Sequence, residues 1–230
     1  MLVTAAIVAA VCVRLGVWQV SRLGERQAHN ALLLGRMAGA RIAAESLPAD
    51  TGEGHYRLAS AHGRADYARE VAWAPRMRQG SPGVNVFTPL RRPGTDTVLL
   101  VNRGWAYSPD AKSVTLARWR ERDTLAVSGY VETFTQDCGS SAPALPAICG
   151  DSVTRVLRKL DRRTAERLIG APVAPYIVMQ TSDSALRADS VPARVEAPVL
   201  DEGPHRSYAL QWFGFAIVSL VGGVALARKR

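Results

Sequence analysis

The chain has 230 residues, 47% of them hydrophobic, and a formal net charge of +9. This length accommodates one globular domain, or a smaller domain together with membrane-spanning segments. The 29 basic residues are nearly all arginines spread along the chain, with a dense run only at the last three positions. Without any DNA- or RNA-binding motif, this distribution argues against nucleic acid as a partner.

The chain begins with a hydrophobic stretch. Residues 2–20 are long enough to cross a bilayer and carry one charge, Arg14. A cleaved signal peptide is the alternative, but it would need a basic start and a small-residue cleavage site, whereas this stretch begins apolar and continues into Arg14 and Trp18. We therefore predict an uncleaved transmembrane helix at residues 1–21. A helical connector is predicted at 22–54, ending at the breaker residues 48–54.

The middle of the chain has the pattern of strands. Turn signals at residues 79–83 and 91–96 separate apolar runs, which is typical of an antiparallel meander. A short helix is expected at Arg162–Ile169, ended by Gly170. We predict a β-rich, barrel-like or sandwich domain at residues 55–186. Its expected strands lie near Tyr56–Ala65, Arg69–Ala74, Val84–Leu90, Thr97–Asn102, Leu125–Glu132, Ser152–Lys159 and Val173–Gln180.

The most distinctive stretch of this domain is V-L-L-V-N-R-G-W-A-Y, residues 98–107. An apolar strand runs into Asn102, Arg103 and Gly104, where we predict a turn. One interpretation is a turn with a packed tryptophan and a surface arginine. The other is a fixed loop that presents Arg103 and Trp105 to a partner or an anionic group.

Three cysteines occur in the chain. Cys12 lies in an apolar run and is expected to be a small hydrophobic residue. Cys138 and Cys149 bracket a loop rich in Gly, Ser and Pro, and a disulfide between them is one possibility, free thiols the other. Their spacing suits neither a zinc site nor a C-x-x-C redox pair.

The chain ends in a second apolar helix. A linker at 187–206 leads into a predicted transmembrane helix at 207–227, followed by the basic tail 228–230. Basic residues favour the cytoplasmic side, and aromatic residues gather at the opposite end of this span. The predicted fold is therefore a membrane protein with two transmembrane helices flanking an extracytoplasmic β-rich domain, located in the inner (plasma) membrane and in contact with lipid.

The outer ends of the two predicted spans carry aromatic and basic residues at helical spacing. Arg14, Trp18 and Arg22 share one face, and His205, Tyr208 and Trp212 share another. An aromatic belt with snorkelling arginines is the simpler interpretation. Convergence of the two faces beside His205 is the functional one, because a neutral imidazole is a common axial ligand of haem iron. No catalytic motif appears, so no enzymatic activity is predicted.

Three stretches together resemble the surfeit-locus family of cytochrome c oxidase assembly factors. They are L-G-V-W-Q-V-S-R at 15–22, R-M-R-Q-G-S-P-G-V-N-V-F-T-P-L at 76–90 with V-N-R-G-W at 101–105, and H-R-S-Y-A-L-Q-W-F at 205–213. The resemblance covers essentially the whole chain. It implies two membrane helices around an external domain and a role in assembling oxidase subunit I.

The resemblance also implies a cofactor. The family histidine that opens the last span is the proposed haem a ligand and matches His205. Tyr208, Trp212 and Trp18 would then flank the macrocycle, and Arg22 or Arg14 would pair with its propionates. The alternative is a cofactor-free chaperone that binds nascent subunit I through its helices and through Arg103 and Trp105.

Overall fold

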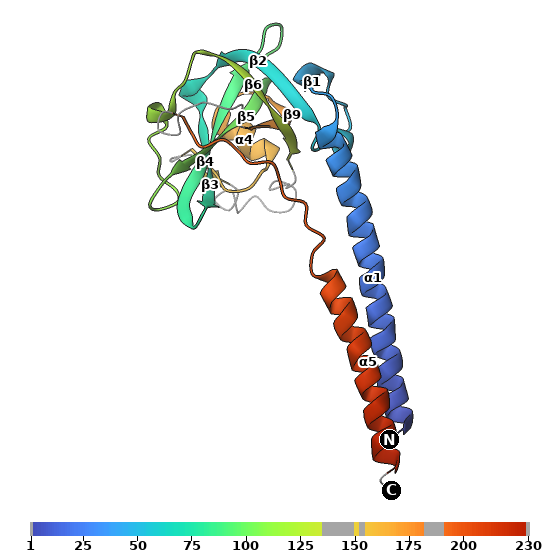
Figure 1. Ribbon diagram of the computed structural model, residues 1–230. Coiled ribbons are helices and arrows are strands. Elements are labelled where there is room, and N and C mark those ends of the chain that lie inside the picture. Colours follow the sequence, from blue (N-terminus) through green and yellow to red (C-terminus); the bar gives the residue numbers. More distant parts are fainter. Residues whose placement is uncertain (1, 135–149, 152–154, 182–190, 229–230) are drawn as a thin grey trace. The chain divides into compact units, whose positions relative to one another are not determined.

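The structure is a computed structural model that describes residues 2–134, 150–151, 155–181 and 191–228 (Figure 1). The chain divides into two compact units. One combines Met1–Gly35 with Val199–Arg230, and the other comprises Arg36–Pro198. The possible Cys138–Cys149 disulfide lies outside the described residues.

The first unit is a pair of long helices. Helix α1 spans Leu2–Ala38 and helix α5 spans His205–Arg228. Each contains an 18-residue window with a mean hydropathy of 1.8, long and apolar enough to cross a membrane. The helices run antiparallel and their free ends lie together (Figure 1). Helix α1 is continuous through Ala38, so the first part of the predicted connector belongs to the same helix.

Small side chains let the two helices approach closely. Ala9 and Cys12 of α1 pack against Ala216 of α5, and Gly223 faces Ala5 near the free ends. Small side chains at the contact allow the backbones of two membrane helices to approach closely. Cys12 is buried and unbonded, which confirms its prediction as a small hydrophobic residue.

The second unit is built on a closed barrel of five strands. Around the barrel the order is β2 (Leu58–Ala65), β6 (Thr124–Thr133), β9 (Val173–Gln180), β5 (Val98–Tyr107) and β4 (Ser81–Arg91). Strand β4 then pairs back with β2 and closes the ring. The predicted fold class, two long apolar terminal helices flanking a β-rich domain, is confirmed.

Shorter elements extend this ring. Strands β3 (Val71–Arg78), β8 (Val156–Leu157) and β7 (Gly150–Asp151) continue the sheet from β4, and β1 (Ile42–Ala43) pairs with β2. Helix α2 is a single turn at Thr51–Gly54. Helix α4 spans Arg162–Ile169 as predicted, capped by Asp161, whose carboxylate accepts from the Thr164 amide, and by Gly170 in the left-handed conformation.

One sequence prediction is wrong in the region of β5. The chain does not turn at Asn102–Gly104; it continues as one strand to Tyr107, with a register irregularity opposite Val86 and Phe87. The predicted antiparallel meander is present in β3, β4 and β5, and the sheet adds one parallel pair, β5 with β9. The run V-L-L-V is continuously apolar because both of its faces are buried: Val98 and Leu100 enter one core cluster, and Leu99 and Val101 another.

The remaining strand predictions differ from the structure mainly at their ends. The strand predicted from Tyr56 begins at Leu58, because Tyr56 has a positive φ of 64°. The strand predicted at Ser152–Lys159 is described only as the short β8, with residues 152–154 outside the described part. The predicted strand Val173–Gln180 is confirmed at both ends.

Candidate functional site

The segment just before helix α5 is held against helix α1. The side-chain amide of Asn30 donates to the carbonyl of Asp201 at 2.8 Å, and that of Gln27 donates to the Glu202 carboxylate at 2.9 Å. Asn30 is buried, so its bond to the Asp201 backbone is shielded from water. These contacts fix where α5 begins relative to α1.

A tight turn then starts the helix. The Asp201 carboxylate accepts from the Gly203 amide at 3.0 Å, and Gly203 adopts a φ of +70°, which glycine tolerates without strain. The Pro204 carbonyl accepts from the amide of Tyr208 at 3.1 Å and from the hydroxyl of Ser207 at 2.8 Å. The turn therefore places His205 at the first position of α5.

His205 contacts a buried polar side chain of the opposite helix. Its Nδ1 lies 2.8 Å from Oε1 of Gln19, a residue that is only 8% exposed. Because an amide oxygen only accepts, Nδ1 carries the proton in this pair and Nε2 keeps its lone pair. Nε2 has no hydrogen bond to any other described residue, and the ring is partly exposed.

The aromatic residues of α5 differ in their surroundings. Trp212 packs against the cluster of Ala9, Cys12 and Ala216, on the face of α5 that contacts α1. Its ring also meets that of Phe215 edge-on. Tyr208 is 45% exposed and lies outside this cluster. His205 and Trp212 therefore lie on the packed face of α5, and Tyr208 lies beside it.

The structure does not bring the predicted aromatic and basic face of α1 into the helix contact. The buried face of α1 follows Ala9, Cys12, Gly16 and Gln19. Trp18 is one residue from Gln19, about 100° around the helix, and is 53% exposed. Arg14 and Arg22 share its face and are likewise exposed, with Arg22 paired to Glu25. Their proposed contact with a cofactor stays a prediction.

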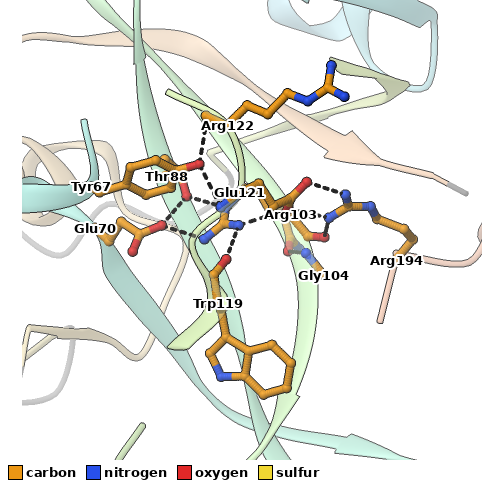
Figure 2. A network of polar contacts seen from close by, with 10 residues as sticks. Tyr67, Glu70, Thr88, Arg103, Gly104, Trp119, Glu121, Arg122 and Arg194 are labelled. Atoms are coloured by element: carbon orange, nitrogen blue, oxygen red, sulfur yellow. Dashed lines mark hydrogen bonds and ion pairs between the residues drawn. The ribbon is translucent and has the colours of Figure 1, made fainter. Parts of the chain in front are cut away.

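A second group of polar residues lies inside the β-domain, around Arg103 (Figure 2). The Arg103 side chain is fully buried. It donates to the Glu70 carboxylate and the Thr88 hydroxyl, both at 2.6 Å, and to Glu121 at 2.8 Å. Arg194 donates to Glu121 at 2.7 Å and to the backbone carbonyl of Arg103 at 2.8 Å.

Two carboxylates of this cluster have pKa values shifted in opposite directions. Burial raises the pKa of Glu70 despite the opposing charge of Arg103, and its Oε2 has no hydrogen-bond partner among the described residues. Burial alone would also raise the pKa of Glu121. There, however, the hydrogen bonds and charges of Arg194 and Arg103 together outweigh it and lower the pKa.

The positions of Arg103 and Trp105 bear on the predicted presentation to a partner. The Arg103 guanidinium cannot reach a partner without leaving these internal ion pairs. Trp105 is half-buried over Gly83, and its backbone exchanges two hydrogen bonds with Ala193. The Arg103 cluster is thus a structural tie within the domain, and a partner contact through Trp105 stays a prediction.

The chain matches the SURF1 family over residues 6–217. The chain belongs to the SURF1 family. This is the surfeit-locus family that the sequence resembles, and it is associated with cytochrome c oxidase assembly. No curated protein matches the chain.

Sequence reasoning missed three residues of this SURF1-family protein that form two contacts between α1 and the start of α5: Gln19, Asn30 and Asp201. Gln19 had a signal, because residues 2–20 contain few polar side chains and Gln19 is one of them, with Thr4 and Arg14. An antiparallel pairing of the two spans places it near His205. Asn30 and Asp201 had none, since single polar residues in a helix and a linker are ordinary at a surface.

Proposed function

We propose that this SURF1-family protein is a non-enzymatic assembly factor that holds haem a at His205 before its insertion into cytochrome c oxidase subunit I. The observation that carries the proposal is the state of the His205 side chain. Its Nδ1 is engaged by Gln19 and its Nε2 is free, partly exposed and able to donate a lone pair. This is the form of imidazole that ligates iron.

The residues around His205 fit a haem better than a bare metal ion. Among the described residues no group of three or more His, Cys, Asp or Glu side chains is placed to hold a metal. A single imidazole suffices only where the iron brings four ligands of its own, as a porphyrin does. When bound, haem a would supply the iron and a large apolar ring.

Aromatic and basic residues of α5 and α1 are the other members of the proposed site. Tyr208 and Trp212 follow His205 on α5, and exposed Trp18 lies beside Gln19 on α1. Flat aromatic side chains offer apolar contact to a macrocycle. Arg14 and Arg22 lie on the same face of α1 as Trp18. Both are exposed, and their guanidinium groups are suited to pairing with propionates.

The membrane position is part of the proposal. The basic residues after α5 favour a cytoplasmic C-terminus, which places the β-domain and His205 on the outer side of the inner membrane. A SURF1-family protein in this orientation would meet subunit I within the membrane and hold the cofactor at its outer surface.

One observation favours a second candidate function, a cofactor-free chaperone of nascent subunit I. Trp18 and Arg22 lie on an exposed face of α1 and do not converge on His205. Aromatic residues and arginine are enriched at protein–protein interfaces, so this exposed face is suited to contact with another protein. In this alternative the helix pair would bind subunit I directly, and His205 would have only a structural contact with Gln19.

The absorption spectrum of the detergent-purified protein, expressed in cells that make haem a, separates the two functions. We expect a Soret band for the wild type and for His29→Ala, a control at an exposed α1 position. We expect the band to be lost or shifted in His205→Ala. Absence of a band in every sample would exclude the haem-carrying function and favour the chaperone.

A further inference from the structure

We propose that Gln19 is a positioning residue that selects the proton tautomer and the ring orientation of His205. The proposal deepens the proposed function, on which the haem part of it rests. The tautomer itself is a property of the haem-free protein. The 2.8 Å contact between Gln19 Oε1 and His205 Nδ1 carries the inference.

The surroundings of Gln19 require a hydrogen-bond partner. It lies on the packed face of α1, one turn after Gly16 and two turns after Cys12, and is 8% exposed. A buried amide without a partner is unfavourable, more so inside an apolar helix contact than at a surface. His205 is the one hydrogen-bond partner of the Gln19 side chain among the described residues. The pair therefore explains why a glutamine is placed there.

The contact is geometrically fixed from both sides. On α1, Gly16 has no side chain and the Phe213 ring occupies the space where one would lie. This close packing limits how α5 can shift along α1 at the level of Gln19. On α5, the turn at Asp201–Gly203 and the bond from Asn30 set the first position of the helix. The backbone positions of Gln19 and His205 are therefore fixed independently of the hydrogen bond between their side chains.

The direction of the hydrogen bond determines which nitrogen is available. With the amide oxygen facing Nδ1, the proton stays on Nδ1 and the lone pair on Nε2 points away from Gln19. Neutral histidine in water prefers the opposite tautomer, with the proton on Nε2. Without Gln19 the ring would favour the form that cannot ligate through Nε2. Partners of this kind orient metal-binding histidines, and losing one weakens metal affinity about 10–100-fold.

Nitrogen-15 NMR of the haem-free, histidine-labelled protein in detergent at about pH 8, above the usual histidine pKa, tests the tautomer directly. We expect His205 to carry its proton on Nδ1 in the wild type and in Gln211→Leu, a control at an exposed α5 position. Gln19→Leu and the near-isosteric Gln19→Met should shift the proton toward Nε2. Gln19→Glu keeps an acceptor oxygen and should keep a proton on Nδ1.

Haem a titration of the same proteins then tests the consequence. We expect binding about 10–100-fold weaker in Gln19→Leu and Gln19→Met, and near wild type in Gln19→Glu and Gln211→Leu. A wild-type proton on Nε2, or a tautomer unchanged in both Gln19→Leu and Gln19→Met, would overturn the positioning role even if haem a binds. A tautomer that depends on Gln19, with no haem a bound by any variant, supports the positioning role and removes only the proposed function.

Discussion

Arg103 is a charged side chain with no exposed surface. Its donors are met by Glu70, Thr88, Glu121 and the carbonyl of Trp119, so the cost of removing the charge from water is offset inside the domain. The same contacts join the segment before β3 with strands β4 and β5 and the chain that follows Leu116–Trp119 (Figure 2). Breaking such a cluster from one side leaves carboxylates buried without a counter-charge.

We predict that Arg103→Met lowers the free energy of unfolding by about 3–5 kcal/mol, because Glu70 is left uncompensated. Denaturant unfolding of the purified protein in detergent measures this. Arg64→Met, at an exposed arginine of β2, should change stability by less than about 0.5 kcal/mol. The double variant Arg103→Met/Glu70→Gln should recover part of the loss. Equal effects of the two arginine substitutions would contradict a structural role for the cluster.

Glu121 gives the domain a defined acid dependence. Its folded-state pKa lies below the ordinary value of 4.5, so the unfolded chain binds its proton more readily. The stability it contributes is present above pH 4.5 and is lost as the pH falls through the lowered pKa. Glu70, with a raised pKa, acts in the opposite sense: its contribution is present below pH 4.5 and is lost as the pH rises through its folded value.

We predict that Glu121→Gln is less stable than the wild type at pH 7, and that the difference shrinks as the pH falls below 4.5. Thermal unfolding of both proteins between pH 3 and pH 7 measures the difference directly, so other carboxylates cancel. A stability difference that is the same at every pH in this range would show that the Glu121 charge is not coupled to folding.

At the scale of elements, the α1–α5 contact depends on where small residues lie. A side chain added at Gly223 would meet the Cβ of Ala5 at 2.5 Å, whereas one added at the neighbouring Gly222 would meet nothing within 4 Å. The two positions share a helix, a sequence context and a depth in the predicted span. They differ in direction: Gly223 lies on the side of α5 that faces α1, and Gly222 does not.

We predict that Gly223→Val weakens the helix contact and that Gly222→Val does not. The readout is the rate of disulfide formation between Cys12 and a cysteine introduced at Ala216, which share one packed cluster. Cys138 and Cys149 are replaced by serine for this measurement. The rate should fall severalfold in Gly223→Val only. Equal rates in both variants would mean that the helices do not meet along this face.

At the scale of the whole molecule, the two helices precede and follow the barrel in the sequence, and the free ends of α1 and α5 lie together (Figure 1). A chain that crosses a membrane twice therefore leaves the whole segment from 36 to 198 on one side. The terminal basic residues favour the cytoplasm, so we propose the outer side for the barrel.

We predict that Asp96→Cys, in the exposed turn between β4 and β5, reacts with a membrane-impermeant maleimide in intact spheroplasts. A cysteine appended after Arg230 should react only after permeabilisation. The Cys138 and Cys149 positions carry serine in both proteins. The reverse pattern would place the barrel in the cytoplasm and would contradict the proposed orientation.

The sequence by itself determined the elements whose cause is local. Two long apolar runs, the first of them with a single charge at Arg14, predict the terminal helices, because the length of each run is matched to a bilayer. Asp161 and Gly170 predict α4, because a cap and a left-handed terminator act within a few residues. His205 stood out for the same reason, as the histidine that immediately precedes an apolar run. The family resemblance came from three short stretches of this kind.

Only the tertiary structure decided which residues meet. The parallel pairing of β5 with β9 joins segments about 75 residues apart, and the burial of Arg103 depends on Glu70, Glu121 and Arg194, which are distant in the sequence. The face of α1 that contacts α5 follows small residues, so Gln19 reaches His205 and Trp18 does not. Adjacent residues of a helix point in directions about 100° apart, so the rotation of α1 about its axis decides which of them faces α5. The packing of the two helices fixes that rotation.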